Sequence, residues 1–279
     1  MSLLNYKTKY VIIINVIILI MKNLKKRRKN MDVKLEKNER IDDLEYKGYK
    51  IIQNVEGFCY GVDSVLLSDY AREIKKNTKV VDIGSGTGII SILLCAKTEL
   101  KKIYGIEIQE DVAEMSRRSI TLNDLDGRCE ILNINIKDVE KYLDKNSFDA
   151  VVTNPPYKKE NTGLKNIDKK NLISRHEVEC NLEDIIEKSK YLLKDLGELF
   201  MVHRAERIVD IMCLLRKYNL EPKNIRFVHP KVNEKPNLVL VRAVKYAKPY
   251  LKIDNPLYIY GEDGDYTDEI YKIYEKRKK

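Results

Sequence analysis

The segment Asn154-Pro155-Pro156-Tyr157 brings an amide, two prolines and an aromatic ring together directly after an apolar run. Proline rings stiffen the backbone and remove N–H donors. The side-chain oxygen of Asn154 and the backbone oxygen of Pro155 are therefore two acceptors that could face the two N–H bonds of one planar amine, localising its lone pair and directing it outward. Tyr157 could stack on a flipped-out base. A simple turn that ends a strand, with the tyrosine filling the core, is the alternative.

This tetrad predicts a particular kind of catalysis. Asparagine is not a general base, so the side chain of Asn154 would act by positioning and polarising the amine. The amine would attack an activated methyl group in line, and its proton would leave afterwards from the resulting cation. Pro156 would fix the geometry of the two acceptors, so that little reorganisation is needed as charge develops.

A glycine-rich turn, VVDIGSGTG at residues 80–88, lies between a predicted strand and a predicted helix. Its glycines follow G-x-G-x-G spacing and permit positive φ and close approach of a ligand to the backbone. A carboxylate at the strand end suits a zwitterionic ligand better than a pyrophosphate, because it can meet an amine directly or through water. A tight turn without a ligand is the alternative. The predicted ligand contacts are Asp82, Gly84, Ser85, Gly86 and Gly88.

Hydrogen-bond acceptors also lie at the ends of two further predicted strands. Glu107 ends the next predicted strand and could accept hydrogen bonds from both hydroxyls of a ribose. In NINIKD, residues 133–138, the amide oxygen of Asn135 could accept the amino proton of an adenine, and the backbone at Ile136 could pair with its ring. An exposed acid and a polar strand end are the simpler readings. With the glycine turn, the pattern favours a cofactor that carries both an amine and an adenosine.

The elements that must position these motifs alternate along the chain. An antiparallel hairpin at the sheet edge is predicted where residues 224–229 and 238–244 follow each other with only a loop between them. Repeated βα units predict a mostly parallel, seven-stranded sheet with helices on both faces and ligands at the carboxyl ends of its strands. The predicted strands are 79–84, 102–108, 129–134, 148–153 and 197–203, and the predicted helices are 88–97, 111–123, 182–193 and 206–218.

Charge and cysteine content narrow the function classes. The net charge is +9, but residues 1–30 hold eight of the 52 basic residues and no acid; the remaining 44 basic residues face 43 acids, a net charge of +1. Nucleic-acid contacts must then come from local patches. The five cysteines and three histidines are scattered without ligand spacing, so we expect neither metal nor disulfides.

Four regions divide the chain. Residues 1–30 join an apolar run to a basic flank; the run is shorter than the roughly 20 residues that span a bilayer, and no cleavage site follows it. We expect a misassigned start, with Met31 as the first residue, and membrane tethering is the alternative. Residues 31–75 would cap a core at 76–246, and residues 247–279 would pack on it or extend from it. We expect a cytoplasmic monomer.

The motifs DIGSGTG, GIE and NPPY together resemble the class I S-adenosylmethionine-dependent methyltransferases that modify planar amino groups. Further stretches, at residues 57–71, 174–186, 201–231 and 256–270, resemble the bacterial tRNA(Val) adenine-N6 methyltransferase family. The likeness covers nearly all of residues 40–270. It implies a Rossmann-like fold, S-adenosylmethionine as cofactor, and N6-methylation of the tRNA adenine next to the anticodon. Asn135 stands where relatives usually carry Asp, which keeps an acceptor, and residues 1–30 have no counterpart.

Other substrates stay open at this point. An rRNA adenine, a guanine N2, a DNA adenine or a protein glutamine also presents a planar amine, and a non-catalytic RNA-binding module is the alternative outside enzymes. Tyr60 and Asp63 lie where such enzymes close over the methionine end of the cofactor, although Asp63 could simply begin a helix. The polar, basic segment 158–171 is a candidate substrate-gripping loop. Candidate substrate contacts are Lys158, Lys159, Arg175, His176 and Arg204.

Overall fold

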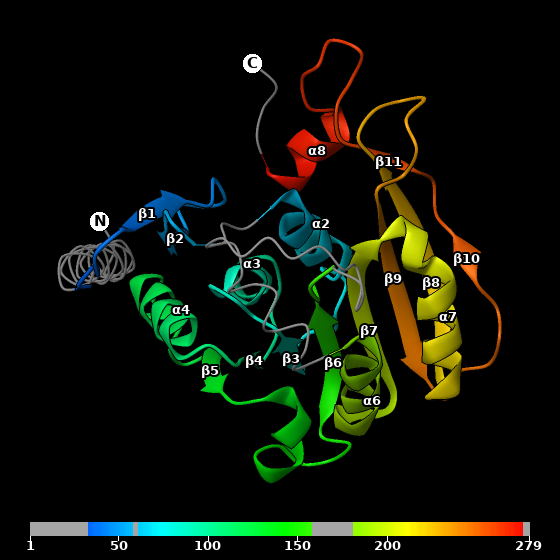
Figure 1. Ribbon diagram of the computed structural model, residues 1–279, viewed down its shortest axis with the longest axis horizontal. Coiled ribbons are helices and arrows are strands. Elements are labelled where there is room, and N and C mark those ends of the chain that lie inside the picture. Colours follow the sequence, from blue (N-terminus) through cyan, green and yellow to red (C-terminus); the bar gives the residue numbers. More distant parts are fainter. Residues whose placement is uncertain (1–32, 58–60, 158–180, 276–279) are drawn as a thin grey trace, which may run out of the picture.

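The fold is known from a computed structural model, which describes residues 33–57, 61–157 and 181–275 (Figure 1). Its strands are β1 Glu39–Asp43, β2 Lys50–Asn54, β3 Lys79–Ile83, β4 Lys102–Glu107, β5 Cys129–Asn133, β6 Phe148–Thr153, β7 Leu193–Arg204, β8 Leu220–His229, β9 Leu238–Lys245, β10 Lys252–Ile253 and β11 Leu257–Tyr258. Its helices are α2 Val62–Tyr70, α3 Ile89–Lys97, α4 Glu110–Leu122, α6 Leu182–Leu192, α7 Ile208–Lys217 and α8 Asp268–Ile273, with the 3-10 turns η1 Ile136–Lys141 and η2 Ala205–Arg207.

The main sheet is mostly parallel with an antiparallel hairpin at one edge, as the sequence predicts. Its seven longer strands run in the order β8-β9-β7-β6-β3-β4-β5. Strands β3 to β7 are parallel to their neighbours within that group, and β9 is antiparallel to both β7 and β8. The predicted number of seven is two too few, because β10 and β11 each add two residues beside β8. Such short strands leave no periodic pattern in a sequence.

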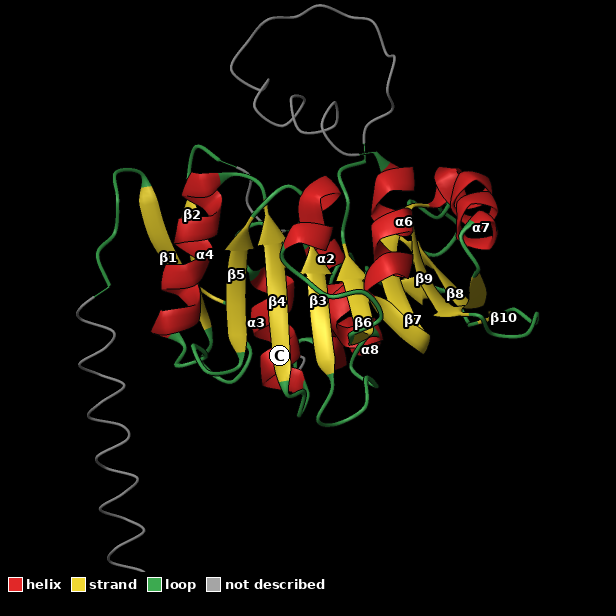
Figure 2. Cartoon of the chain, turned by 90° about the horizontal axis from the view of Figure 1, so that it is seen from below, coloured by secondary structure: helices red, strands yellow, loops and turns green. Residues whose placement is uncertain are grey.

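Helices cover both faces of this sheet (Figures 1 and 2). Successive side chains of a strand point to opposite faces, so neighbouring residues enter different cores. Val80 and Val152 belong to the core beneath α2, α3, α4 and α8, whereas Val81 and Val151 belong to the core beneath η1, α6 and α7. The central strands are apolar on both sides for this reason, as is usual in parallel sheets.

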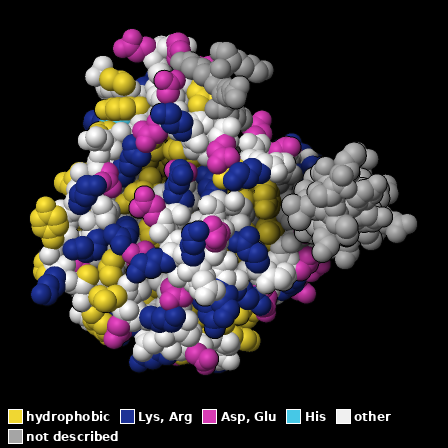
Figure 3. Space-filling view, turned by 180° about the vertical axis from the view of Figure 1, so that it is seen from behind, with side chains coloured by type: hydrophobic (Ala, Val, Ile, Leu, Met, Phe, Trp, Pro, Cys, Tyr) yellow, Lys and Arg dark blue, Asp and Glu magenta, His cyan; other side chains and the backbone are white. Residues whose placement is uncertain are grey.

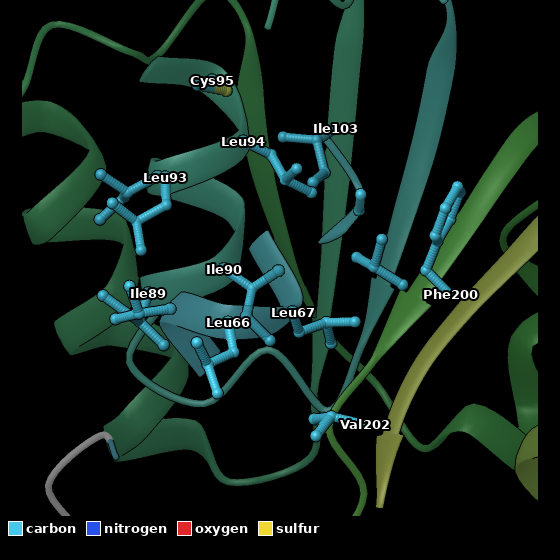
Figure 4. Packing of buried hydrophobic residues seen from close by; sticks show 14 of the residues in the cluster. Leu66, Leu67, Ile89, Ile90, Leu93, Leu94, Cys95, Ile103, Phe200 and Val202 are labelled. Carbon is cyan, nitrogen blue, oxygen red and sulfur yellow. The ribbon is translucent and has the colours of Figure 1, made fainter. Parts of the chain in front are cut away.

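Helix α2 is anchored firmly against the sheet. Leu66 and Leu67 are almost completely buried and lie in one cluster with Ile90 of α3 and with Phe200 and Val202 of β7 (Figure 4). Burial of leucine side chains of this size typically contributes about 1.5–3 kcal/mol each. The packing fixes the direction of α2 and with it the position of its first turn.

Residues before α2 form a hairpin that docks on α4. Strands β1 and β2 are antiparallel and form a separate two-stranded sheet. The backbone N–H of Ile52 donates to Ser119 Oγ at 3.0 Å, and that of Lys50 donates to Asn123 Oδ1 at 2.8 Å. Polar side chains of α4 thus satisfy donors on the inner edge of the hairpin. Within the described residues, no helix is both long and apolar enough to cross a membrane.

Candidate active site

The motifs meet where the strand order reverses. From β3 the chain moves outward through β4 and β5, and it then returns to the other side of β3 with β6. Ile83 of β3 is paired with Thr153 of β6, and Thr153 Oγ1 donates to the Ile83 carbonyl oxygen at 3.0 Å. Gly84 and Asn154 therefore leave neighbouring strands side by side. Crevices at such a switch point are the usual ligand sites of open α/β sheets.

The glycine turn is tied to the end of β4. Gly86 has a φ of +53° and its N–H donates to Glu107 Oε2 at 3.0 Å. The other carboxylate oxygen of Glu107 accepts from the backbone N–H of Gln109 at 2.9 Å. A β-carbon built on Gly84 or Gly86 would meet no atom within 4 Å, so the turn has open space beside it. Glu107 and the turn thus form one wall that a ligand can approach closely.

Asp82 lies beneath this turn and is completely buried. Its Oδ2 accepts from Ser91 Oγ of α3 at 2.8 Å, whereas its Oδ1 has no hydrogen-bond partner among the described residues. Burial raises the pKa of Asp82 to about 7, because the charged form loses its hydration. The buried hydroxyls of Ser85 and Ser116 likewise lack partners within the described part of the chain. Unsatisfied groups of this kind fit a polar ligand that completes their hydrogen bonds.

Asn135 has a structural role that was not predicted from the sequence. It caps η1, and its Oδ1 accepts from the backbone N–H of Lys137 at 2.9 Å. The oxygen retains one lone pair for a ligand, so its predicted contact with an adenine stays a prediction. Ile136 begins η1 and is buried. A neighbour that sequence reasoning missed, Asn133, donates from Nδ2 to the carbonyl oxygens of Glu107 and Ile108 at 2.9 and 3.0 Å and fixes the end of β4.

The tetrad follows β6 and is held by the first turn of α2. Asn154 Nδ2 donates to Ser64 Oγ at 3.2 Å, while Tyr157 Oη lies 2.6 Å from Asn154 Oδ1 and 2.8 Å from Asp63 Oδ2. Pro155 is buried between them, and Pro156 is exposed. Asp63 thus lies in the first turn of α2, as one of its two predicted roles requires, and its predicted place at the methionine end of the cofactor stays a prediction. Ser64 was missed because an isolated serine in a helix carries no functional pattern.

Residues at the end of β7 contact the ring of Tyr157. The His203 ring meets the tyrosine ring edge-on, with centroids 5.3 Å apart, and the Arg204 guanidinium carbon lies 5.2 Å from the centre of the tyrosine ring. Burial lowers the pKa of His203 to about 4, so the imidazole is neutral at physiological pH, with Nδ1 accepting from the Arg204 N–H at 2.8 Å. Burial and the neighbouring Asp63 carboxylate raise the pKa of Tyr157. The ring expected to stack on a base is thus already in contact with Arg204.

The structure brings together most residues predicted from the sequence. The glycine turn, Asp82, Glu107, the tetrad and Arg204 lie at one edge of the sheet, as the hydrogen bonds and ring contacts above show. Tyr60 and the segment 158–171 lie outside the described residues, as do the candidate contacts Lys158, Lys159, Arg175 and His176. Among the residues that are described, no three His, Cys, Asp or Glu side chains gather as a metal site.

The family follows from a comparison with known domains. The model of the methyltransferase small domain matches residues 61–218, more than half of the chain. The chain belongs to this methyltransferase family. A protein from Porphyromonas gingivalis named tRNA1(Val) (adenine(37)-N6)-methyltransferase is 27% identical to this methyltransferase over 241 residues, which cover 84% of this chain and 94% of the relative. Proteins with the same name from Pedobacter heparinus and Haemophilus influenzae are 27% and 23% identical, over 82% of this chain and 94% of each relative. The resemblance predicted from the motifs is confirmed.

Solved structures agree with the fold of the methyltransferase. A protein described as a predicted O-methyltransferase from Agrobacterium tumefaciens matches with a TM-score of 0.63 and 21% identity, covering 76% of this chain and 95% of its own. TYW2 of P. horikoshii, solved in complex with MeSAdo, matches with a TM-score of 0.56 and 14% identity over 76% of this chain and 73% of its own. The predicted class I methyltransferase fold is therefore confirmed.

Proposed function

We propose that this methyltransferase transfers the methyl group of S-adenosylmethionine to the exocyclic N6 amine of an adenine in tRNA. The observation that carries the proposal is the position of Asn154 and Pro155 directly beside Gly84, where β6 and β3 end together. This arrangement sets the two predicted acceptors of an amine next to the predicted cofactor wall. The names of the curated relatives support the choice of tRNA and of adenine.

The residues at the glycine turn fit the cofactor. The unpartnered Asp82 Oδ1 would accept from its ammonium group, and the carboxylate of Glu107 would accept from its ribose hydroxyls. The open side of Gly84 and Gly86 leaves room for close backbone contact. When bound, S-adenosylmethionine supplies a methyl group made electrophilic by its sulfonium centre. Two solved neighbours, TYW2 of P. horikoshii in complex with MeSAdo and TYW2 of M. jannaschii in complex with AdoMet, support a cofactor of this class.

The chain itself contributes orientation and polarisation. Asn154 Oδ1 and the Pro155 carbonyl oxygen would accept the two N–H bonds of the adenine amine, as predicted from the tetrad. Ser64 holds the amide of Asn154 through a 3.2 Å hydrogen bond, so the oxygen keeps its direction. Pre-organised acceptors of this kind reduce the reorganisation needed when charge develops. The His203 imidazole is buried and accepts a backbone N–H at Nδ1, so it supports the ring of Tyr157.

The curated relatives are named for adenine 37 of a valine tRNA, and we extend this position to the chain as part of the proposal. The surface is compatible with local rather than global contacts to RNA. On the face shown in Figure 3, Lys and Arg side chains are interspersed with Asp and Glu side chains. Arg204 at the tetrad is exposed and can meet a phosphate or a base near the target.

The proposal is tested by methyl transfer from labelled S-adenosylmethionine into unmodified tRNA, followed by nucleoside mass spectrometry. We expect N6-methyladenosine with the wild-type chain. Asn154→Ala should lose turnover by at least about a hundredfold, as removal of a transition-state hydrogen-bonding group typically does. Its affinity for the cofactor, measured by calorimetry, should change little. The exposed Asn255→Ala serves as the matched control and should keep full turnover.

Two results would contradict the proposal. If Asn154→Ala lost cofactor affinity and turnover together, Asn154 would hold the cofactor or the fold and not the amine. If the wild-type chain bound the cofactor but left tRNA unlabelled, the substrate would have to be sought among the other planar amines: rRNA, DNA or a protein glutamine.

A further inference from the structure

Tyr157 has one hydroxyl proton and two acceptors. Its Oη lies 2.6 Å from Asn154 Oδ1 and 2.8 Å from Asp63 Oδ2, both within hydrogen-bond distance. A phenol donates a single hydrogen bond, whereas an amide oxygen and a carboxylate oxygen can only accept. At any moment, therefore, only one of the two acceptors beside Tyr157 receives its hydrogen bond.

One of these two acceptors, Asn154 Oδ1, is the atom that would accept the substrate amine in the proposed reaction. While Tyr157 donates to Asn154 Oδ1, that lone pair is not available to the N–H of a substrate amine. While Tyr157 donates to Asp63, the Asn154 oxygen and the tyrosine oxygen face each other without a proton between them. An incoming amine supplies the missing donor, because its N–H can take the free lone pair of Asn154.

The surroundings of Asp63 suit it to accept the hydrogen bond of the Tyr157 hydroxyl. Its Oδ1 already accepts from the backbone N–H of Ser64 at 2.8 Å, in the first turn of α2, where a carboxylate is favoured by the helix dipole. Its Oδ2 is directed at Tyr157. Hydrogen bonds to a carboxylate are roughly twice as strong as those between neutral groups. The buried leucines of α2 hold this turn in place against β7.

We infer that Asp63 is a positioning residue: it accepts the hydrogen bond of the Tyr157 hydroxyl and so keeps Asn154 Oδ1 free for the substrate amine. The inference rests on the proposed function, because it requires an amine at Asn154. Tyr157 then has two hydrogen-bonded states, one that occupies Asn154 Oδ1 and one that releases it, and the Asp63 carboxylate favours the second. Asp63 acts only through the hydroxyl of Tyr157.

A double-mutant cycle tests this dependence. Asp63→Asn replaces a charged acceptor by a neutral one and should lower kcat for tRNA methylation about tenfold, the difference between a charged and a neutral hydrogen bond. Because Tyr157→Phe removes the competing donor, Asp63→Asn should change kcat by less than about twofold in the Y157F background. The KM for the cofactor should stay constant in all variants.

A matched control and a second readout accompany the cycle. Glu183, in the first turn of α6, accepts from Tyr218 Oη at 2.8 Å and also from Lys217 Nζ. Glu183→Gln therefore likewise replaces a charged acceptor of a tyrosine hydroxyl by a neutral one. It should leave kcat unchanged. The same four Asp63 and Tyr157 proteins are also unfolded by denaturant, and the two substitutions should show a coupling in unfolding free energy that does not depend on any substrate.

The outcomes separate this inference from the proposed function. An equal fall in kcat for Asp63→Asn with and without the tyrosine hydroxyl would overturn the inference alone. So would complete loss of turnover in Tyr157→Phe, because the hydroxyl would then be required for the reaction itself. If the wild-type chain methylates no tRNA, the proposed function fails; the unfolding cycle then still decides whether Asp63 and Tyr157 are coupled.

Discussion

At the scale of single residues, Asp82 shows how burial sets the chemistry of the site. Its carboxyl group is completely buried, receives one hydrogen bond from Ser91 and leaves Oδ1 without a partner among the described residues. The pKa of Asp82 is raised to about 7 because burial penalises the charged form. A ligand ammonium group would favour the ionised carboxylate, so cofactor binding and the protonation of Asp82 should be linked.

We therefore expect the affinity for S-adenosylmethionine to depend on pH. Between about pH 6 and about pH 7.5 it should rise roughly fivefold to tenfold, as the ionised fraction of Asp82 increases. Titration calorimetry at several pH values measures this. Asp82→Asn should bind weakly with a flat profile, and a flat profile in the wild-type chain would contradict the assignment.

The same shift predicts the sign of a stability effect. The pKa of Asp82 in the folded chain lies above its value in the unfolded chain. The contribution of the neutral group to stability is therefore present at low pH and is lost as the pH rises through about 7. Asp82→Asn should remove this dependence in denaturant unfolding.

At the scale of elements, two glycines distinguish the energetic cost of a left-handed backbone from the space that a bound cofactor needs. Gly86 and Gly48 both have positive φ, +53° and +73°, and neither would bring a β-carbon within 4 Å of another atom. Only Gly86 lies beside Glu107 and the proposed cofactor wall. The two glycines are thus alike in backbone strain and differ in what lies next to them.

Alanine at each position should show this difference. Gly86→Ala and Gly48→Ala should each lower the unfolding free energy by about 1–2 kcal/mol, the cost of a left-handed backbone for an L-residue. Cofactor affinity should fall at least about tenfold for Gly86→Ala only, because the new methyl group enters the space needed for close backbone approach. A loss of affinity in both variants, or in neither, would argue against a cofactor at this turn.

Most elements could be predicted because their signals are local. The strands of the parallel sheet are short apolar runs that end at polar or glycine residues, and Asn181 caps α6 with a full capping box, as its sequence suggests. Strands β10 and β11 could not be predicted, because their pairing with β8 is a long-range contact of two residues each. The docking of the β1–β2 hairpin on α4 depends on contacts across some 70 positions of the chain.

The site was predictable to the same extent. The sequence shows Asp82, the glycine turn, Glu107 and the tetrad because each lies at or directly after the end of a strand at the same edge of the sheet. Ser64 and Ser91 were missed because their importance comes only from the partners that folding brings to them, Asn154 and Asp82. The cap that Asn135 forms on η1 was missed because this segment was considered only for its possible contact with a ligand.

At the scale of the whole molecule, charge is divided unevenly along the chain. Residues 1–30 carry eight basic residues and no acid, while residues 31–279 carry a net charge of +1. The face in Figure 3 shows both signs intermingled over the folded part. In a chain that begins at Met1, and not at the expected Met31, long-range attraction to RNA should therefore depend mainly on the first thirty residues, and recognition of the target on the site itself.

Removing residues 1–30 should separate these two contributions. We expect weaker binding of non-cognate RNA and a shallower dependence of that binding on salt, because fewer counterions are released. The rate of methylation at saturating tRNA should stay within about twofold of the full chain, since the site lies in later residues. Filter binding at several salt concentrations and initial-rate assays measure both. A large fall in the saturated rate would instead give the segment a part in catalysis.

Residues 252–273 cover surfaces that earlier elements leave open, which matters while the chain is being synthesised. Strands β10 and β11 cover β8, and α8 packs on α2, the helix whose first turn holds the tetrad. These are the last elements in chain order. While the ribosome is still translating this region, the edge of β8 stays open and α2 lacks one of its neighbours. A chain that lacks β10 and β11 would expose an unpaired strand edge at β8, which invites aggregation and degradation.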